Sequence, residues 1–314
     1  MVSPCGAIPI PFDLQLNGYA GLDFGADDLT PAALRRACER IRADGGGTVL
    51  ATIITDAVDR LTARLTRLAD AIEADPFVAE VVTGIHVEGP FIRAEKGYVG
   101  AHPPEHAVAA TVEAARTLVA AGRGHVRLVT LAPERDAGFR TTAWLADQGI
   151  VVFAGHCDPS LAELGAAAKA GLAGFTHFGN GCPHLLPRHD NIVQRVLACD
   201  ALRWITFIPD RVHVPIMALG NYLRLIGIDR AIAVTDSTAA AGMGPGTFRI
   251  GSQRVVVGDD GAAWSEDRTH LCGATITMAR AAEILATDLG FSAADVQRLI
   301  DTNPRRAVPI PRPG

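Results

Sequence analysis

The chain has 314 residues, of which 48% are hydrophobic, and a formal net charge of −5, which is enough apolar material for a large core. The mild acidity and the lack of any basic block of five or more residues argue against nucleic acid as a partner. The chain has no apolar run near 18 residues and no leader-like N-terminus, which predicts a soluble cytoplasmic protein without a membrane partner.

Eight short apolar runs alternate with amphipathic stretches. The runs cover residues 11–17, 47–54, 81–88, 126–132, 150–156, 173–178, 203–209 and 230–236. The amphipathic stretches lie near 30–43, 58–74, 105–122, 139–148, 159–171, 190–200, 214–226, 275–289 and 292–302. Strand followed by helix, repeated eight times, is typical of a parallel sheet. We therefore predict an α/β fold, a (β/α)8 barrel of the TIM type, as one catalytic domain over residues 1–314.

An open doubly wound sheet is the alternative. We favour the barrel because polar side chains end nearly every run, and a barrel turns all of its strand ends towards one mouth. An open sheet would concentrate its site at one switch point. The polar residues at the strand ends are Asp13, Gln15, Asn17, Thr55, Asp56, Glu88, Glu134, His156, His177, Asp210 and Asp236.

Two further features are the starts of two helices and an insertion. Thr30 with Pro31, and Asp158 with Pro159, have the pattern of a helix N-cap followed by proline at the first helical position. A β-hairpin insertion is predicted near 247–264, between the eighth strand and its helix, where two apolar stretches are joined through Ser252.

Three metal-capable side chains each close an apolar strand. They are Glu88, which a Gly-Pro pair follows directly, His156 and His177. A buried carboxylate is unfavourable unless it pairs or binds a metal. One carboxylate and two imidazoles, with a fourth position open, form the ligand set of a catalytic zinc site. Taken singly, each histidine could be a hydrogen-bonded core residue, but a barrel would bring all three together.

Asp236 ends the eighth run. It could cap the segment that follows. Its functional interpretation is a general base, because a carboxylate beside a metal can accept the proton of a water whose pKa the metal lowers. The same group can later pass that proton to a leaving nitrogen.

Five motifs occur in order along the chain. They are HVEGPF at 86–91, GHCD at 155–158, THFGN at 176–180, VTDS at 234–237 and LCGATITM at 271–278. In this order the chain resembles the N-acetylglucosamine-6-phosphate deacetylases, which are metal-dependent barrels of the amidohydrolase superfamily. The stretch DLQLNG at 13–18 is also similar to the first strand of that family, and the resemblance covers about residues 11–307.

The resemblance implies that Glu88, His156 and His177 hold the metal. Many amidohydrolases hold a second metal with a His-x-His pair on the first strand and a carbamylated lysine on the fourth. Here the first strand has Gln15 and Asn17, and neither lysine lies at a strand end. We therefore expect one divalent ion, zinc first, with iron, cobalt or manganese as alternatives.

The resemblance also implies the remaining roles. Asp236 is the base and acid, and His102 approaches the reacting carbonyl. Arg188 would reach the phosphate bound to a neighbouring subunit, which makes a homodimer possible. The predicted substrate contacts are Asn180, Gly181, Arg188, His213, Gln15 and Asn17.

Three features depart from the family pattern. The first barrel strand begins near Phe12, so the usual small flanking β domain is expected to be largely missing. Asn180-Gly181-Cys182-Pro183 replaces the more usual Asn-Ala-Met, and the loop 93–102 is longer than the usual Lys-Gly-Ala-His. All three fall on substrate or subunit contacts, not on the metal ligands.

The activity implied by the resemblance is the removal of acetate from an N-acetylated amino sugar phosphate, foremost N-acetylglucosamine 6-phosphate. A related amidohydrolase acting on another N-acyl or cyclic amide substrate is one alternative. A degenerate barrel that only binds a sugar phosphate is another, and the intact ligand set with Asp236 argues against it.

Overall fold

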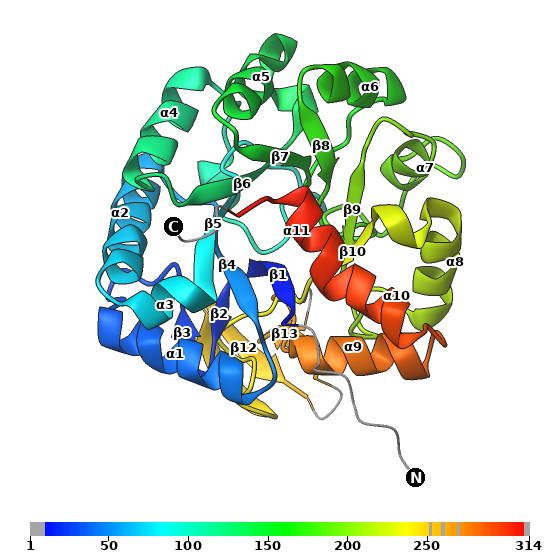
Figure 1. The fold of residues 1–314 in the computed structure, drawn as a ribbon. Coiled ribbons are helices and arrows are strands. Elements are labelled where there is room, and N and C mark those ends of the chain that lie inside the picture. The colour runs from blue at the N-terminus through cyan, green and yellow to red at the C-terminus, as the bar shows by residue number, and fades with distance from the viewer. Residues whose placement is uncertain (1–9, 251–252, 259–260, 269–270, 311–314) are drawn as a thin grey trace.

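A computed structural model describes residues 10–250, 253–258, 261–268 and 271–310. Eight parallel strands form one sheet in chain order (Figure 1): β1 (Phe12–Leu16), β4 (Thr48–Ile54), β5 (Val82–Glu88), β6 (Val126–Leu131), β7 (Val151–Ala154), β8 (Leu172–Phe175), β9 (Trp204–Phe207) and β10 (Ala231–Ala233). A parallel bridge between Leu16 and Ser237 joins the two edges, and the Asp236 N–H donates to the Gln15 carbonyl at 2.9 Å. The predicted eight-stranded barrel is confirmed, with its closure made beyond the end of β10.

Figure 1 shows the helices as an outer ring around these strands. The helices that follow the strands are α1 (Pro31–Ala43), α2 (Val58–Glu73), α4 (Val112–Ala121), α5 (Arg140–Asp147), α6 (Leu161–Lys169), α7 (Ile192–Leu197), α8 (Ile216–Ile226) and α9 (Met278–Thr287), with α10 (Ala293–Gln297) after them. Two short helices were not predicted, α3 (Pro76–Val81) and α11 (Asn303–Ala307). Each is too short to show a helical period in the sequence.

The caps explain where two helices begin. The Thr30 hydroxyl accepts the Ala33 N–H at 3.2 Å, as predicted. The prediction that Asp158 caps α6 is wrong, because Ser160 does so in a reciprocal capping box with Glu163. The box satisfies two backbone donors at once, whereas a cap at Asp158 would satisfy one. The Asp158 carboxylate is therefore left for other partners.

The insertion after β10 is a three-stranded antiparallel sheet, β11 (Gly246–Ile250), β12 (Gln253–Val257) and β13 (Ala263–Ser265). The first two strands pair as the predicted hairpin, whose turn at 251–252 lies outside the described residues. A separate apolar cluster of Val255, Val257 and Ala263 stabilises this sheet. A second small pair, β2 (Gly18–Tyr19) and β3 (Leu22–Asp23), follows β1. The single-domain assignment and the largely missing flanking domain stay predictions.

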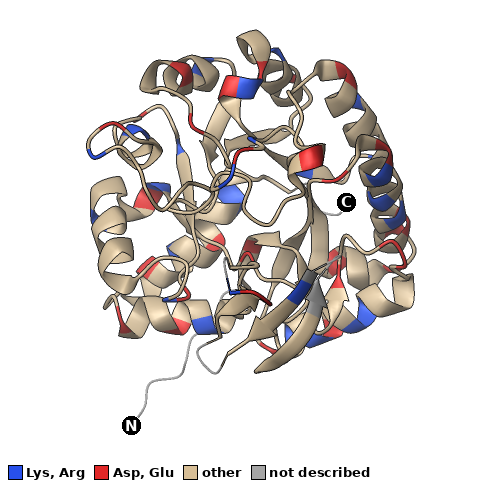
Figure 2. Cartoon of the chain, turned by 180° about the vertical axis from the view of Figure 1, so that it is seen from behind, with Lys and Arg blue, Asp and Glu red and all other residues tan. Residues whose placement is uncertain are grey.

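Charges of both signs are interspersed along the outer helices (Figure 2). Arg123, for example, bonds Asp70 and Glu73 across the surface. Such exposed pairs contribute little to stability. No helix in the described ranges combines the length and the apolarity that crossing a bilayer requires.

One carboxylate is buried in β1. Asp13 is 4% exposed and accepts hydrogen bonds from the backbone N–H groups of Gln15 and Thr235 and from the Thr235 hydroxyl. Burial outweighs these bonds and raises the pKa of Asp13 from 3.8 to about 7. Because the folded state holds this proton more tightly than the unfolded chain, stability is lost as the pH rises from about 4 through 7.

Replacing Asp13 by asparagine should remove this pH-dependent loss. At pH 8 the Asp13→Asn variant should be more stable than the wild type by up to about 4 kcal/mol, from a pKa shift of 3.8 to about 7. The Thr235 hydroxyl, 3.4 Å from the Gln15 carbonyl, can turn to accept from the new amide. Urea unfolding of metal-free protein at pH 4 and pH 8 measures the effect. Equal stability is expected at pH 4, and a variant less stable than the wild type at pH 8 would contradict the argument.

Candidate active site

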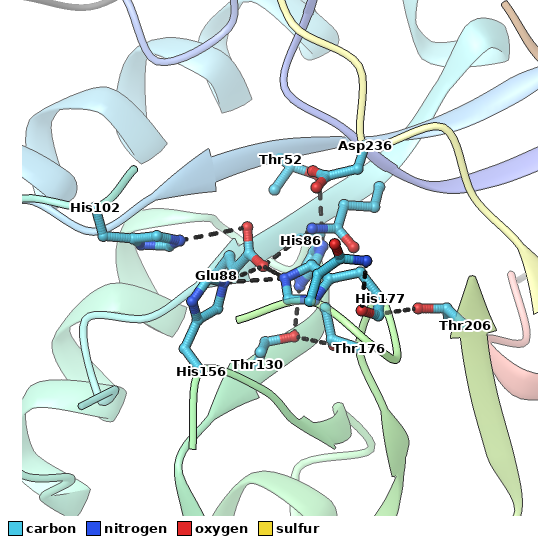
Figure 3. A network of polar contacts seen from close by, with 12 residues as sticks. Thr52, His86, Glu88, His102, Thr130, His156, Thr176, His177, Thr206 and Asp236 are labelled. Carbon is cyan, nitrogen blue, oxygen red and sulfur yellow. Dashed lines mark hydrogen bonds and ion pairs between the residues drawn. The ribbon is translucent and has the colours of Figure 1, made fainter. Parts of the chain in front are cut away.

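Glu88, His156 and His177 converge at one mouth of the barrel (Figure 3). Glu88 Oε1 lies 3.3 Å from His156 Nε2 and 3.0 Å from His177 Nε2, and these two nitrogens are 2.9 Å apart. All three side chains are buried. The structure thus brings together the three residues that the sequence predicted as metal ligands.

A hydrogen bond to His156 leaves a lone pair of that ring facing Glu88. The Tyr98 carbonyl, which can only accept, lies 2.6 Å from His156 Nδ1, so Nδ1 carries the hydrogen and Nε2 is unprotonated in the neutral ring. Burial would raise the pKa of Glu88, but the contacts with His156 and His177 hold it well below its usual range. Acceptor atoms this close repel unless a cation or proton lies among them. The donor set therefore fits a divalent cation with mixed nitrogen and oxygen ligands.

Left-handed backbone turns deliver several of these side chains. His156, His177 and Asp236 have φ values of 52°, 33° and 49°, a region that residues other than glycine rarely adopt. The predicted runs extended to 156, 178 and 236, whereas β7, β8 and β10 end two or three residues earlier. The chain leaves the sheet at these left-handed turns, which direct the side chains into the mouth, and backbone strain of this kind is typical of functional sites.

Asp236 lies at the same mouth, partly exposed. Its Oδ1 accepts a hydrogen bond from Asn17 Nδ2 at 2.7 Å. Loss of solvent around the carboxyl and the nearby negative charge of Glu88 raise the pKa of Asp236 to about 6. Asn17 thus fixes Oδ1 of Asp236, while Oδ2 has no hydrogen-bond partner among the described residues.

Gln15 contacts a metal-ligand candidate. Its Nε2 donates to Glu88 Oε1 at 3.0 Å, across 73 positions of sequence. The resemblance placed Gln15 among substrate contacts. In this structure its amide orients the Glu88 carboxylate, and a role in binding substrate stays a prediction.

His102 reaches the site from the loop that follows β5. Its Nδ1 accepts the Thr55 N–H at 3.3 Å, so Nε2 carries the hydrogen and lies 3.8 Å from Glu88 Oε2. Burial is the largest cause that lowers the pKa of His102, and the neighbouring His156 lowers it further, to about 3. The ring is therefore neutral. His102 is therefore an N–H donor directed into the mouth.

The other predicted contacts differ in their surroundings. The backbone and side-chain N–H groups of Asn180 both donate to the His177 carbonyl, at 3.0 and 3.2 Å. His213 Nδ1 lies 2.6 Å from Asp210 Oδ2, which leaves its Nε2 for a ligand. Arg188 is exposed in the loop before α7 and has no hydrogen bond or ion pair within the described part of the chain. The structure does not bring Arg188 to the three convergent ligands.

Gly181 packs against two of the ligand candidates. A Cβ at this position would lie 3.2 Å from His156 Nδ1 and 3.2 Å from His177 Cε1. The resemblance marked Gly181 as a substrate contact, and this close approach, with a φ of 62°, already favours glycine here. Sequence reasoning missed Tyr98, which orients His156, and found Thr55 only as a polar strand end, not as the partner that orients His102. Tyr98 orients His156 through its backbone carbonyl, which every residue type possesses.

Alanine at Gly181 should therefore weaken metal binding. We expect Gly181→Ala to lower zinc affinity about tenfold, because the added methyl displaces both imidazoles. The matched control is Gly138→Ala, since Gly138 has φ 65° against 62° for Gly181 and nothing within 4 Å of its Cβ position. Both variants carry a similar left-handed strain of about 1 kcal/mol. Competition with a chromophoric chelator measures the affinities, and equal affinities in the two variants would refute the contact.

No family model matches the chain. It is 28% identical to the N-acetylglucosamine-6-phosphate deacetylase of Bacillus subtilis, over 98% of this chain and 77% of the relative. It is 29% identical to the N-acetylgalactosamine-6-phosphate deacetylase of Shewanella sp., over 96% and 74%. The solved structure of the Mycobacterium smegmatis N-acetyl-D-glucosamine-6-phosphate deacetylase superposes with a TM-score of 0.85 and 27% identity, covering 99% of this chain and 83% of the other. With the barrel and the buried Glu-His-His site, these similarities support the resemblance to the N-acetylglucosamine-6-phosphate deacetylases of the amidohydrolase superfamily.

Proposed function

We propose that this protein hydrolyses the acetamide of an N-acetylated amino sugar 6-phosphate, first of all N-acetylglucosamine 6-phosphate, to the free amine and acetate. The observation that carries the proposal is the convergence of Glu88, His156 and His177 at the mouth that also holds Asp236. The sugar-phosphate substrates named for its relatives support the substrate class.

The ligand set fits one divalent cation, and zinc is the first choice for two imidazoles and a carboxylate, ahead of iron, cobalt or manganese. A cation held there would polarise the amide carbonyl and would lower the pKa of a water molecule towards neutrality. The side-chain N–H groups of Gln15 and Asn17 donate to Glu88 and Asp236, and they offer no lone pair to a second cation there. This supports a single ion.

The protein's own groups move the protons. Asp236 accepts a proton from the attacking water while Asn17 holds one of its oxygens in place. The water oxygen bonds to the acetamide carbon, and the C–N bond then breaks as Asp236 returns the proton to the nitrogen. The Nε2–H of His102 donates to the carbonyl oxygen as negative charge builds there. The products are acetate and the amino sugar phosphate.

Binding of the sugar phosphate is proposed on the residues around this mouth. The His213 Nε2, left available by Asp210, and the loop at Asn180 supply polar groups. Arg188, exposed and without a partner among the described residues, is suited to a phosphate contributed across a homodimer. The homodimer and the cytoplasmic location stay predictions.

Asp236→Asn should abolish turnover and leave the metal in place. The amide oxygen can still accept from Asn17, so the geometry is kept, but the group can no longer accept a proton. We expect kcat to fall by about 10³-fold or more. Acetate release and metal content per chain are measured on the same sample. Activity close to that of the wild type would show that another group is the base.

A panel of substrates tests the proposed specificity. With zinc added, acetate release should be fastest from N-acetylglucosamine 6-phosphate, followed by its galactosamine epimer. The sugar without phosphate should lose about 100-fold in kcat/KM, because charge-assisted bonds to phosphate are strong. Faster hydrolysis of an N-acetyl amino acid would favour the related amidohydrolase. A metal-loaded protein inert towards the whole panel would favour a barrel that only binds.

A further inference from the structure

The loop 93–102 is fastened to the segment that carries His156. The Arg93 N–H donates to the His156 carbonyl at 3.1 Å, and the Tyr98 carbonyl accepts from His156 Nδ1 at 2.6 Å. The Tyr98 hydroxyl then donates to Asp158 Oδ2 at 2.8 Å. Tyr98 thus contacts the chain at positions 156 and 158, once with its backbone and once with its side chain. The loop and the ligand candidate are held together at three points.

Asp158 is itself held firmly. Its N–H donates to Glu134 Oε1 at 2.6 Å, and its Oδ1 accepts from Arg195 at 3.0 Å. The two carboxylate oxygens therefore have separate partners, Arg195 from α7 and the Tyr98 hydroxyl. Because Ser160 caps α6, this carboxylate serves no helix end. The Asp158 carboxylate is therefore a fixed acceptor, and the hydrogen bond to it fixes the Tyr98 hydroxyl.

The Tyr98 hydroxyl is a donor. Burial and the neighbouring Asp158 raise the pKa of Tyr98 to about 12, so the phenol remains protonated. The Arg93 guanidinium lies 4.7 Å from the centre of the Tyr98 ring and holds it by a cation–π contact. The ring and the hydroxyl are thus held by different partners, so the hydroxyl can be removed without losing the stacking.

His156 depends on this support. Its backbone has a left-handed φ of 52°, which is unfavourable for a residue with a side chain unless neighbours hold it. A Cβ at Gly100 or Gly181 would lie 3.2 Å from its ring, so both positions present bare backbone to the imidazole. The Nδ1 bond to Tyr98 is the hydrogen bond that fixes how Nε2 faces Glu88.

We propose that Tyr98 is a positioning residue for the metal centre, locking the loop 93–102 against Asp158 so that its carbonyl orients His156 and the same loop presents His102. The inference rests on the metal centre of the proposed function and deepens it. Outer partners of metal-binding histidines set the ring orientation and the basicity of the ligand nitrogen, and their loss weakens metal affinity. The side chain of Tyr98 acts here through the loop, not through the substrate.

Tyr98→Phe tests this role, because it removes the bond to Asp158 and leaves the ring and the carbonyl. The matched control is Tyr19→Phe, since the Tyr19 hydroxyl also donates to an aspartate, Asp44, at 2.8 Å. We expect zinc affinity, measured by chelator competition on the metal-free full chain, to fall about tenfold in Tyr98→Phe. It should change less than twofold in Tyr19→Phe. The visible spectrum of the cobalt-loaded protein should change only in Tyr98→Phe.

The outcomes separate the two proposals. If the wild type binds no zinc, the proposed metal centre itself is refuted. A wild type that binds zinc, with Tyr98→Phe binding equally well, would overturn the role of Tyr98 alone. If Tyr98→Phe does not fold, Asp158→Ala decides the question by removing the acceptor instead, and an unchanged zinc affinity in that variant overturns the inference. Asp158→Asn, which keeps an oxygen for the hydroxyl, should retain more affinity than Asp158→Ala.

Discussion

The close approach of three buried metal-capable atoms is the constraint on which this site depends. Glu88 Oε1 and the Nε2 atoms of His156 and His177 lie within hydrogen-bond distance of one another, at a place with little solvent to screen them. Side chains on unconstrained loops would lose this arrangement. A parallel barrel maintains it, because its strand ends are fixed by backbone bonds on both sides, and a cation would stabilise it.

The supports of this arrangement come from distant parts of the chain. Gln15 on β1 donates to Glu88, Thr55 after β4 sets the tautomer of His102, and Tyr98 sets that of His156. Each acts through a hydrogen bond to the side chain that it orients. Together they fix which nitrogen of a ring carries hydrogen, so the site has defined donors and acceptors before any ligand arrives. Rigid positioning of this kind reduces the reorganisation that a reaction at the mouth would require.

The sequence predicted the parts of this molecule that have a local signal. Glu88 could be found because a Gly-Pro pair stops a buried strand directly after a carboxylate, and His156 and His177 because each follows an apolar run. His102 follows no apolar run, so only the resemblance to a family pointed to it. Tyr98 could not be found, since a backbone carbonyl leaves no trace in composition. Asp158 was assigned to a helix cap because Asp-Pro fits that pattern, and only the tertiary structure shows its partners to be Tyr98 and Arg195.

The first strand shows how a change of residue type alters what a shared barrel can hold. Imidazoles at positions 15 and 17 would offer lone pairs to a second cation. The amides of Gln15 and Asn17 instead present N–H donors, at 3.0 Å from Glu88 and 2.7 Å from Asp236. A donor facing a carboxylate stabilises its negative charge without adding positive charge, whereas a second cation would compete for both carboxylates. Asn17 thereby fixes one oxygen of Asp236, and the two β1 amides occupy with N–H donors the places where a second cation would need lone pairs.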